Sequence, residues 1–71
     1  MTTTGTAWVE AFATQLGVEP PDAATIETLL ELAGVAAHAS ERIAAPIACW
    51  LVGRAGMEPE MALRAAQHTL T

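Results

Sequence analysis

The chain has 71 residues, of which 52% are hydrophobic and only 15% are charged. Three arginines and no lysine stand against eight acidic residues, so the formal net charge is -5. The arginines are scattered and form no basic stripe of the kind that nucleic acid or an anionic membrane surface requires, so neither partner is expected. A domain this short has a thin core, and its high apolar fraction predicts exposed surface that a protein partner covers.

Cysteine content and the ends of the chain bear on localisation. Cys49 is the single cysteine and has no internal disulfide partner, and the Thr-rich start lacks the basic and apolar regions of a signal peptide. The longest apolar run, residues 43–52, is about half a membrane span and contains Pro46. We therefore expect a cytoplasmic protein without a membrane helix. Its domain is expected to span residues 6–71, after a flexible N-terminus of residues 1–5.

Glycine and proline divide the chain into four short helices, which predicts an all-α fold, a compact bundle. The first helix is expected to begin after Thr6, which serves as its cap, and to end at Gly17. Its apolar residues fall at spacings of one, three and four, which places them on a single stripe. They are Trp8, Val9, Phe12, Ala13 and Leu16. We interpret Trp8 and Phe12 as core anchors in preference to a ligand-stacking pair.

The second helix is expected to follow Asp22 as its cap and to reach about Ala39. Its apolar surface, with Leu29 as a core anchor, spans more than half the circumference, which suits a central helix with neighbours on two sides. Gly34 within this helix costs about 1 kcal/mol relative to alanine. It therefore predicts a tight crossing with another helix, with a conformational hinge as the alternative.

The third helix is expected to take Pro46 in its first turn and to present Ile47, Trp50 and Leu51 on one face as further core anchors. The fourth is expected to open with Pro59 and to reach about Thr69. Its apolar face consists mainly of alanines, which pack closely but bury little area. This last helix is therefore expected to depend most on a partner.

One cluster concentrates polar chemistry between two apolar helices, namely His38, Ser40, Glu41 and Arg42. A nucleophilic serine needs a base, an orienting group and oxyanion donors, and so short a bundle has few loops to supply them. We favour a structural role. Ser40 and Glu41 would cap the third helix, Arg42 would bind the carbonyl end of the second, and His38 would join both through a buried hydrogen bond. Partner binding is the alternative, and catalysis is least favoured.

Metal and cofactor sites are not expected. His38, Cys49 and His68 have neither paired spacing nor a fourth ligand, and the sequence contains no phosphate-binding loop or dinucleotide fingerprint.

Residues 32–54 read LAGVAAHASERIAAPIACWLVGR. Together with a leading tryptophan helix, this run resembles a small actinobacterial domain family of unknown function. The family pattern is L-A-x-x-x-A-H-x-x-E-R-x-A-A-P followed by an aromatic-leucine-x-glycine helix. The matching residues are Trp8, His38, Glu41, Arg42, Ala44, Ala45, Pro46, Trp50, Leu51 and Gly53. The resemblance covers nearly the whole chain and is weakest after Gly56.

Members of that family are similar to stand-alone polypeptides of this size or to tails of MobA-type guanylyltransferases, which complete the molybdenum cofactor, and they accompany formate dehydrogenase. The resemblance implies a small subunit or assembly helper of a molybdenum or tungsten formate dehydrogenase, or of its cofactor-maturation enzyme. It supplies no functional residues. The leading hypothesis is therefore a non-catalytic protein-binding module. The alternatives are a self-associating homodimer and, less favoured, a minimal cofactor-binding protein that uses His38, Glu41 and Arg42.

Overall fold

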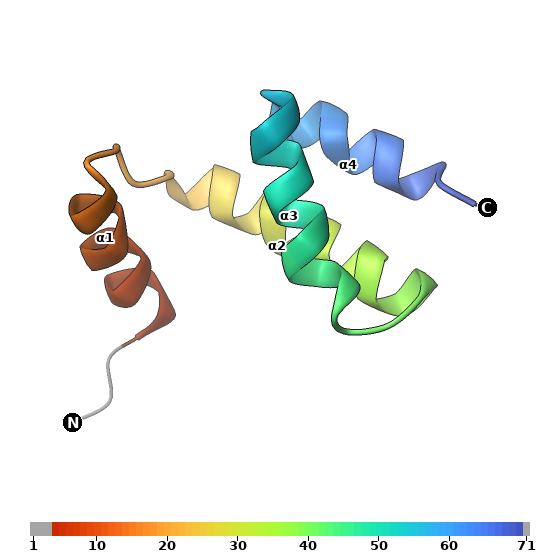
Figure 1. Cartoon of the computed structure of the whole chain (residues 1–71), viewed down its shortest axis with the longest axis horizontal. Coiled ribbons are helices and arrows are strands. Elements are labelled where there is room, and N and C mark those ends of the chain that lie inside the picture. The colour runs from red at the N-terminus through yellow and green to blue at the C-terminus, as the bar shows by residue number, and fades with distance from the viewer. Residues whose placement is uncertain (1–3, 71) are drawn as a thin grey trace.

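The computed structural model describes residues 4–70, which fold into four α-helices (Figure 1). They are α1 (Gly5–Leu16), α2 (Ala23–Ala39), α3 (Ala44–Ala55) and α4 (Pro59–Gln67). No strand occurs within this part of the chain. The predicted all-α fold of four short helices is confirmed. None of these helices is long and apolar enough to cross a membrane, as far as residues 4–70 show.

Helix α1 begins two residues earlier than predicted. Thr4, not Thr6, is the N-cap, and its Oγ1 accepts a hydrogen bond from the Ala7 amide at 3.1 Å. The helix ends as predicted at Gly17, whose φ of 73° is left-handed, and the Val18 amide donates to the Ala13 carbonyl at 3.0 Å. Of the segment 1–5 that was expected to be a flexible N-terminus, residues 1–3 lie outside the described residues, whereas Thr4 caps α1 and Gly5 is its first residue.

Helix α2 begins as predicted after Asp22, whose Oδ1 accepts a hydrogen bond from the Thr25 amide at 2.8 Å. That backbone hydrogen bond, supported by the Thr25 side chain, holds the pKa of Asp22 below its usual value. The main contacts between helices are those of α2 with α3 and of α2 with α4. The predicted central position of α2 is therefore correct.

Helices α3 and α4 differ from expectation at their ends. Ile43 is the N-cap of α3 and makes no side-chain capping bond, so the predicted capping by Ser40 and Glu41 is wrong. Pro46 falls in the first turn of α3, as expected. Helix α4 begins at Pro59, as predicted, but it ends two residues before Thr69.

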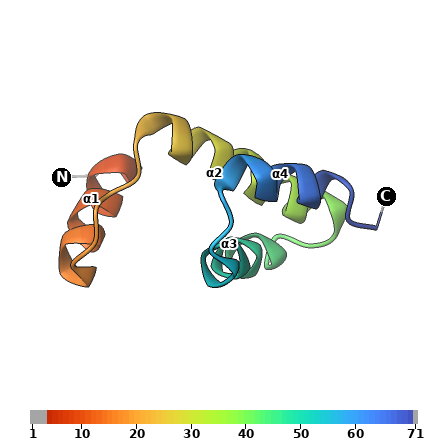
Figure 2. The same ribbon diagram turned by 90° about the horizontal axis from the view of Figure 1, so that it is seen from above.

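Helix α1 lies beside the N-terminal end of α2, apart from α3 and α4, and residues 17–22 connect it to α2 (Figures 1 and 2). The molecule is accordingly elongated, with dimensions of 40 × 27 × 18 Å. Helix α1 therefore adds little to the packing of the other three helices.

The core is very small. Within residues 4–70 the buried apolar residues are Ala13, Leu32 and Ala62, and Leu32, at 1% exposure, is the large one. Five of the six predicted core anchors are exposed instead, namely Trp8, Phe12, Ile47, Trp50 and Leu51, while Leu29 is half-buried. Spacing had identified the apolar face of each helix correctly as a face. In the described part of the chain no second helix covers the five exposed anchors on α1 and α3, and this is why the core prediction fails.

The predicted tight crossing at Gly34 is also wrong. A Cβ placed on Gly34 would have no atom within 4 Å other than those of its own helix. The neighbours of α2 pack on other positions of this helix, so the small size of Gly34 serves no close approach.

Candidate interaction surface

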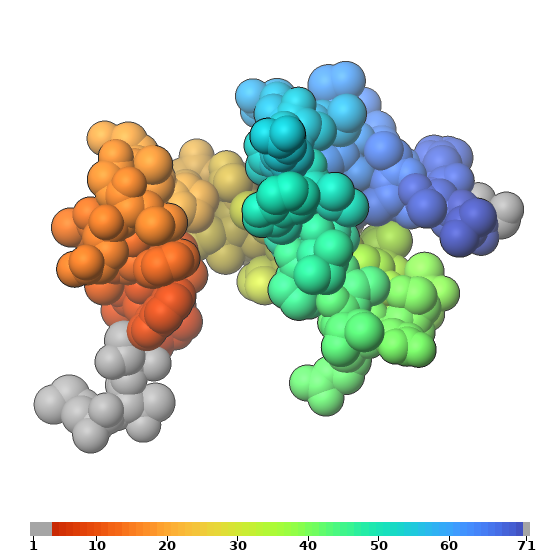
Figure 3. Space-filling model, in the orientation of Figure 1, coloured from red at the N-terminus to blue at the C-terminus, as the bar shows by residue number. Residues whose placement is uncertain are grey.

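An open apolar groove of about 1030 Å³ lies between α3 and α4, with the C-terminal half of α2 as its floor. We call it the α3–α4 groove. Leu32, Val35 and Ala36 line it from α2. Among the described residues that line it, Glu41 is the one charged side chain. Figure 3 shows the molecule hollowed between these helices.

The two walls of the groove differ in side-chain size. Helix α3 contributes the larger residues Ile47 and Leu51, both more than half exposed, whereas α4 contributes Ala62, Ala65 and Ala66. The alanine wall predicted for the last helix is thus present, and it faces an open groove. A wall of small residues lets another helix approach closely.

A second apolar surface follows one side of α1. We call it the α1 stripe and define it as Trp8, Val9, Phe12 and Leu16. Trp8 is 57% exposed and Phe12 is 48% exposed, and their ring centroids lie 5.0 Å apart with a tilt of 32°. The two rings stabilise one another within the helix. Their outer faces remain in contact with solvent.

The predicted polar cluster forms no network in the described residues. His38, Ser40, Glu41 and Arg42 are all exposed. The Ser40 hydroxyl donates to the Ala36 carbonyl at 3.0 Å and so closes the end of α2. The predicted buried hydrogen bond of His38 is wrong because the side chain is exposed.

The backbone of the same loop does have a structural role. The Ala44 amide donates to the Glu41 carbonyl at 2.9 Å, and the Ala45 amide donates to the Arg42 carbonyl at 3.1 Å. These bonds form the turn that leads into α3. The backbone carbonyls of Glu41 and Arg42, not their side chains, therefore accept the first amide hydrogen bonds at the start of α3.

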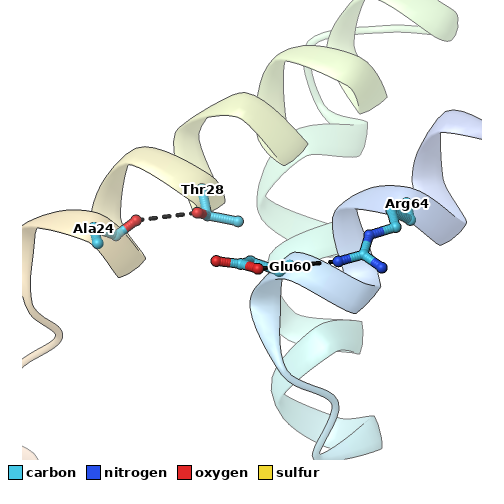
Figure 4. A network of polar contacts seen from close by, with 4 residues as sticks. All are labelled: Ala24, Thr28, Glu60 and Arg64. Carbon is cyan, nitrogen blue, oxygen red and sulfur yellow. Dashed lines mark hydrogen bonds and ion pairs between the residues drawn. The ribbon is translucent and has the colours of Figure 1, made fainter.

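A shallow polar depression of about 430 Å³ lies between the starts of α2 and α4. Figure 4 shows Thr28, whose Oγ1 donates to the Ala24 carbonyl at 3.0 Å, facing the Glu60 side chain. Glu60 forms an ion pair with Arg64 at 4.0 Å, and both side chains are at least 70% exposed. An exposed pair at this distance contributes little stability.

The remaining candidate ligands are dispersed. Cys49 is half-buried, and His68 lies at the end of α4 with its Nδ1 2.7 Å from the Arg64 carbonyl oxygen. No group of three or more His, Cys, Asp or Glu side chains is suitably placed for a metal ion in the described part of the chain.

Fold and surface together define a small all-α domain whose apolar residues are mostly exposed around a three-helix groove. The chain belongs to the family described as Domain of unknown function (DUF6457), whose model matches residues 2–71. The expected membership of a small domain family of unknown function is thereby confirmed. No curated protein matches the chain, and no solved structure matches it.

Proposed function

We propose that this chain is a non-catalytic protein-binding module. The observation that carries the proposal is the large solvent-accessible surface area of the chain. The chain exposes 5790 Å², whereas a compact monomer of 7.4 kDa is expected to expose about 4,200 Å². The difference of about 1,600 Å² is close to what one protomer contributes to a permanent interface.

The chemistry of the exposed residues supports the same function. All four helices and their connections expose large apolar side chains, including Trp8, Leu30, Trp50 and Met61. Tryptophan and methionine are typical of the centres of protein interfaces. The net charge of -5 favours a partner whose surface around the contact is basic.

The sequence resemblance supports a choice of partner. The H-x-x-E-R-x-A-A-P pattern around His38 and Pro46 is similar to domains that accompany formate dehydrogenase or follow MobA-type guanylyltransferases. We therefore propose a small subunit or assembly helper of a molybdenum or tungsten formate dehydrogenase, or of the enzyme that completes its cofactor.

Recovery of the tagged protein from its native host at endogenous level tests this function. Wild type is expected to retain a molybdenum enzyme or a cofactor guanylyltransferase. Trp50→Gln, which removes an apolar side chain that is 64% exposed on α3, is expected to lose it. Arg54→Gln alters the same helix without removing apolar area and serves as the control. Recovery of the wild-type protein alone, as a monodisperse monomer, would refute the proposal.

A further inference from the structure

The α3–α4 groove has the form of a helix bundle that lacks one member. Helix α2 forms the floor and contacts both α3 and α4, which form the walls. Ile43 and Leu70 extend the apolar lining at the ends of the groove, and they are 72% and 101% exposed. One further amphipathic helix would cover this lining and complete a four-helix arrangement.

The same chain contains such a helix, α1, whose large apolar side chains Trp8, Val9, Phe12 and Leu16 are all exposed. Helix α1 has 12 residues, the same length as α3, which corresponds to about 18 Å. It presents the α1 stripe, and its one charged residue is Glu10. Since Glu41 is the one charge among the described lining residues of the groove, docking would desolvate few charges at its centre.

The connection between α1 and α2 holds α1 away from its own groove. Its first part is closed by the left-handed Gly17 and the hydrogen bond from the Val18 amide to Ala13. Its last part is closed by Asp22, which caps α2. Between them lie Pro20 and Pro21, which favour extended backbone and provide no amide donors. The segment therefore acts as a spacer that presents α1 outward.

We propose that α1 of a second copy of this chain occupies the α3–α4 groove, and that reciprocal exchange of α1 closes a two-fold dimer. This inference rests on the proposed function, because it assigns one part of the protein-binding surface to a second copy. Trp8 and Phe12 would insert against the alanine wall of α4, where large side chains meet small ones. Trp50 does not line the groove and stays available to an outside partner.

The area is consistent with a dimer of this kind. The excess of about 1,600 Å² per copy allows the dimer to bury up to about 3,200 Å², within the range of permanent homodimers, and the area that the dimer leaves exposed, including Trp50, remains for an outside partner. Two copies of charge -5 repel one another. However, Glu41 is the one acidic residue of the α1 stripe and the groove lining taken together, and salt screens exposed charges beyond about 8 Å.

Sedimentation of the purified full chain over a range of concentrations tests the dimer. Wild type is expected to show the dimer mass. Phe12→Glu in the α1 stripe and Ala65→Glu in the groove should each weaken the dimer by about a hundredfold or more, because each change occurs twice in a two-fold dimer. Both positions are exposed, so the fold tolerates the charge. Ala7→Glu on the side of α1 away from the α1 stripe and Gln67→Glu on α4 outside the groove are the charge-matched controls and should keep the dimer mass.

Mixing identifies which surfaces meet. Phe12→Glu retains an intact groove and Ala65→Glu retains an intact α1, so an equimolar mixture is expected to form a heterodimer at concentrations where each variant alone is monomeric. Self-association through a surface that pairs with itself would give no such recovery. A wild-type dimer that Ala65→Glu leaves intact would also overturn the inference.

Tryptophan emission reports the position of α1. In Trp50→Phe, the remaining Trp8 should shift its emission to shorter wavelength as the dimer forms, whereas Trp50 in Trp8→Phe should not. A monomer at every concentration whose Trp8 is already blue-shifted would show that α1 folds onto its own groove, and would overturn the dimer. Recovery of a molybdenum enzyme from the host would then still support the proposed function, so the two failures are distinguishable.

Discussion

Replacement of Leu32 by alanine is expected to remove much of the stability of this domain, because Leu32 is the large side chain that the described core buries, at 1% exposure. Loss of three carbon atoms removes about 2.4 kcal/mol of transfer free energy, at about 0.8 kcal/mol for each. A cavity adds to this cost, although the adjoining groove limits the addition, so we expect about 3 kcal/mol in total. A single hydrophobic core in a domain of fewer than about 80 residues rarely supplies more than about 3 to 5 kcal/mol of unfolding free energy. The variant is therefore expected to be only marginally folded.

Urea unfolding followed by far-UV circular dichroism measures this loss, with all proteins at one concentration. Leu30→Ala is the matched control, because Leu30 lies on the same helix and is 66% exposed. Its cost is expected to stay below about 0.5 kcal/mol. Equal losses in the two variants, or a loss below about 1 kcal/mol for Leu32→Ala, would refute the view that the core is centred on Leu32.

Three further predictions concern local features. Gly34→Ala should raise the unfolding free energy by about 0.5 to 1 kcal/mol, because the added Cβ meets no neighbour. Gly56→Ala should lower the unfolding free energy by about 1 kcal/mol, because φ at this position is 67°. Thermal unfolding of the two variants checks the opposite signs. The lowered pKa of Asp22 predicts that its capping of α2 contributes fully to stability above about pH 4, and that this contribution is lost as the pH falls through the pKa of the folded state. Asp22→Asn should flatten this dependence in unfolding curves recorded down to about pH 2. His38→Ala should change the unfolding free energy by less than about 0.5 kcal/mol, because the side chain is exposed, and a larger loss would restore a structural role for the polar cluster.

The positions of the four helices could be predicted because their signals are local. Asp22 binds an amide three residues away, Gly17 adopts the left-handed turn that its missing Cβ permits, and Pro59 occupies the first turn of α4. The start of α1 was misplaced by two residues because Thr4 and Thr6 flank Gly5 and both can cap a helix. Spacing alone does not distinguish between them.

The candidate interaction surface could be predicted only in part. Composition and length indicated that apolar area would remain exposed, since surface and volume follow from chain length. The polar cluster was correctly placed between two helices, but the contacts expected of its side chains depended on how α3 leaves the loop. The α3–α4 groove had no signal of its own, because its lining combines residues from three helices.

Sequence by itself determined which segments are helical and which side of each helix is apolar, since both depend on residues at most four positions apart. Tertiary structure alone decided which apolar sides are covered. Trp8 and Leu32 both lie on apolar helix faces, yet Trp8 is exposed and Leu32 is buried. Burial requires a second element at the same place, and only the path of the chain through residues 17–22, 40–43 and 56–58 determines where that element lies.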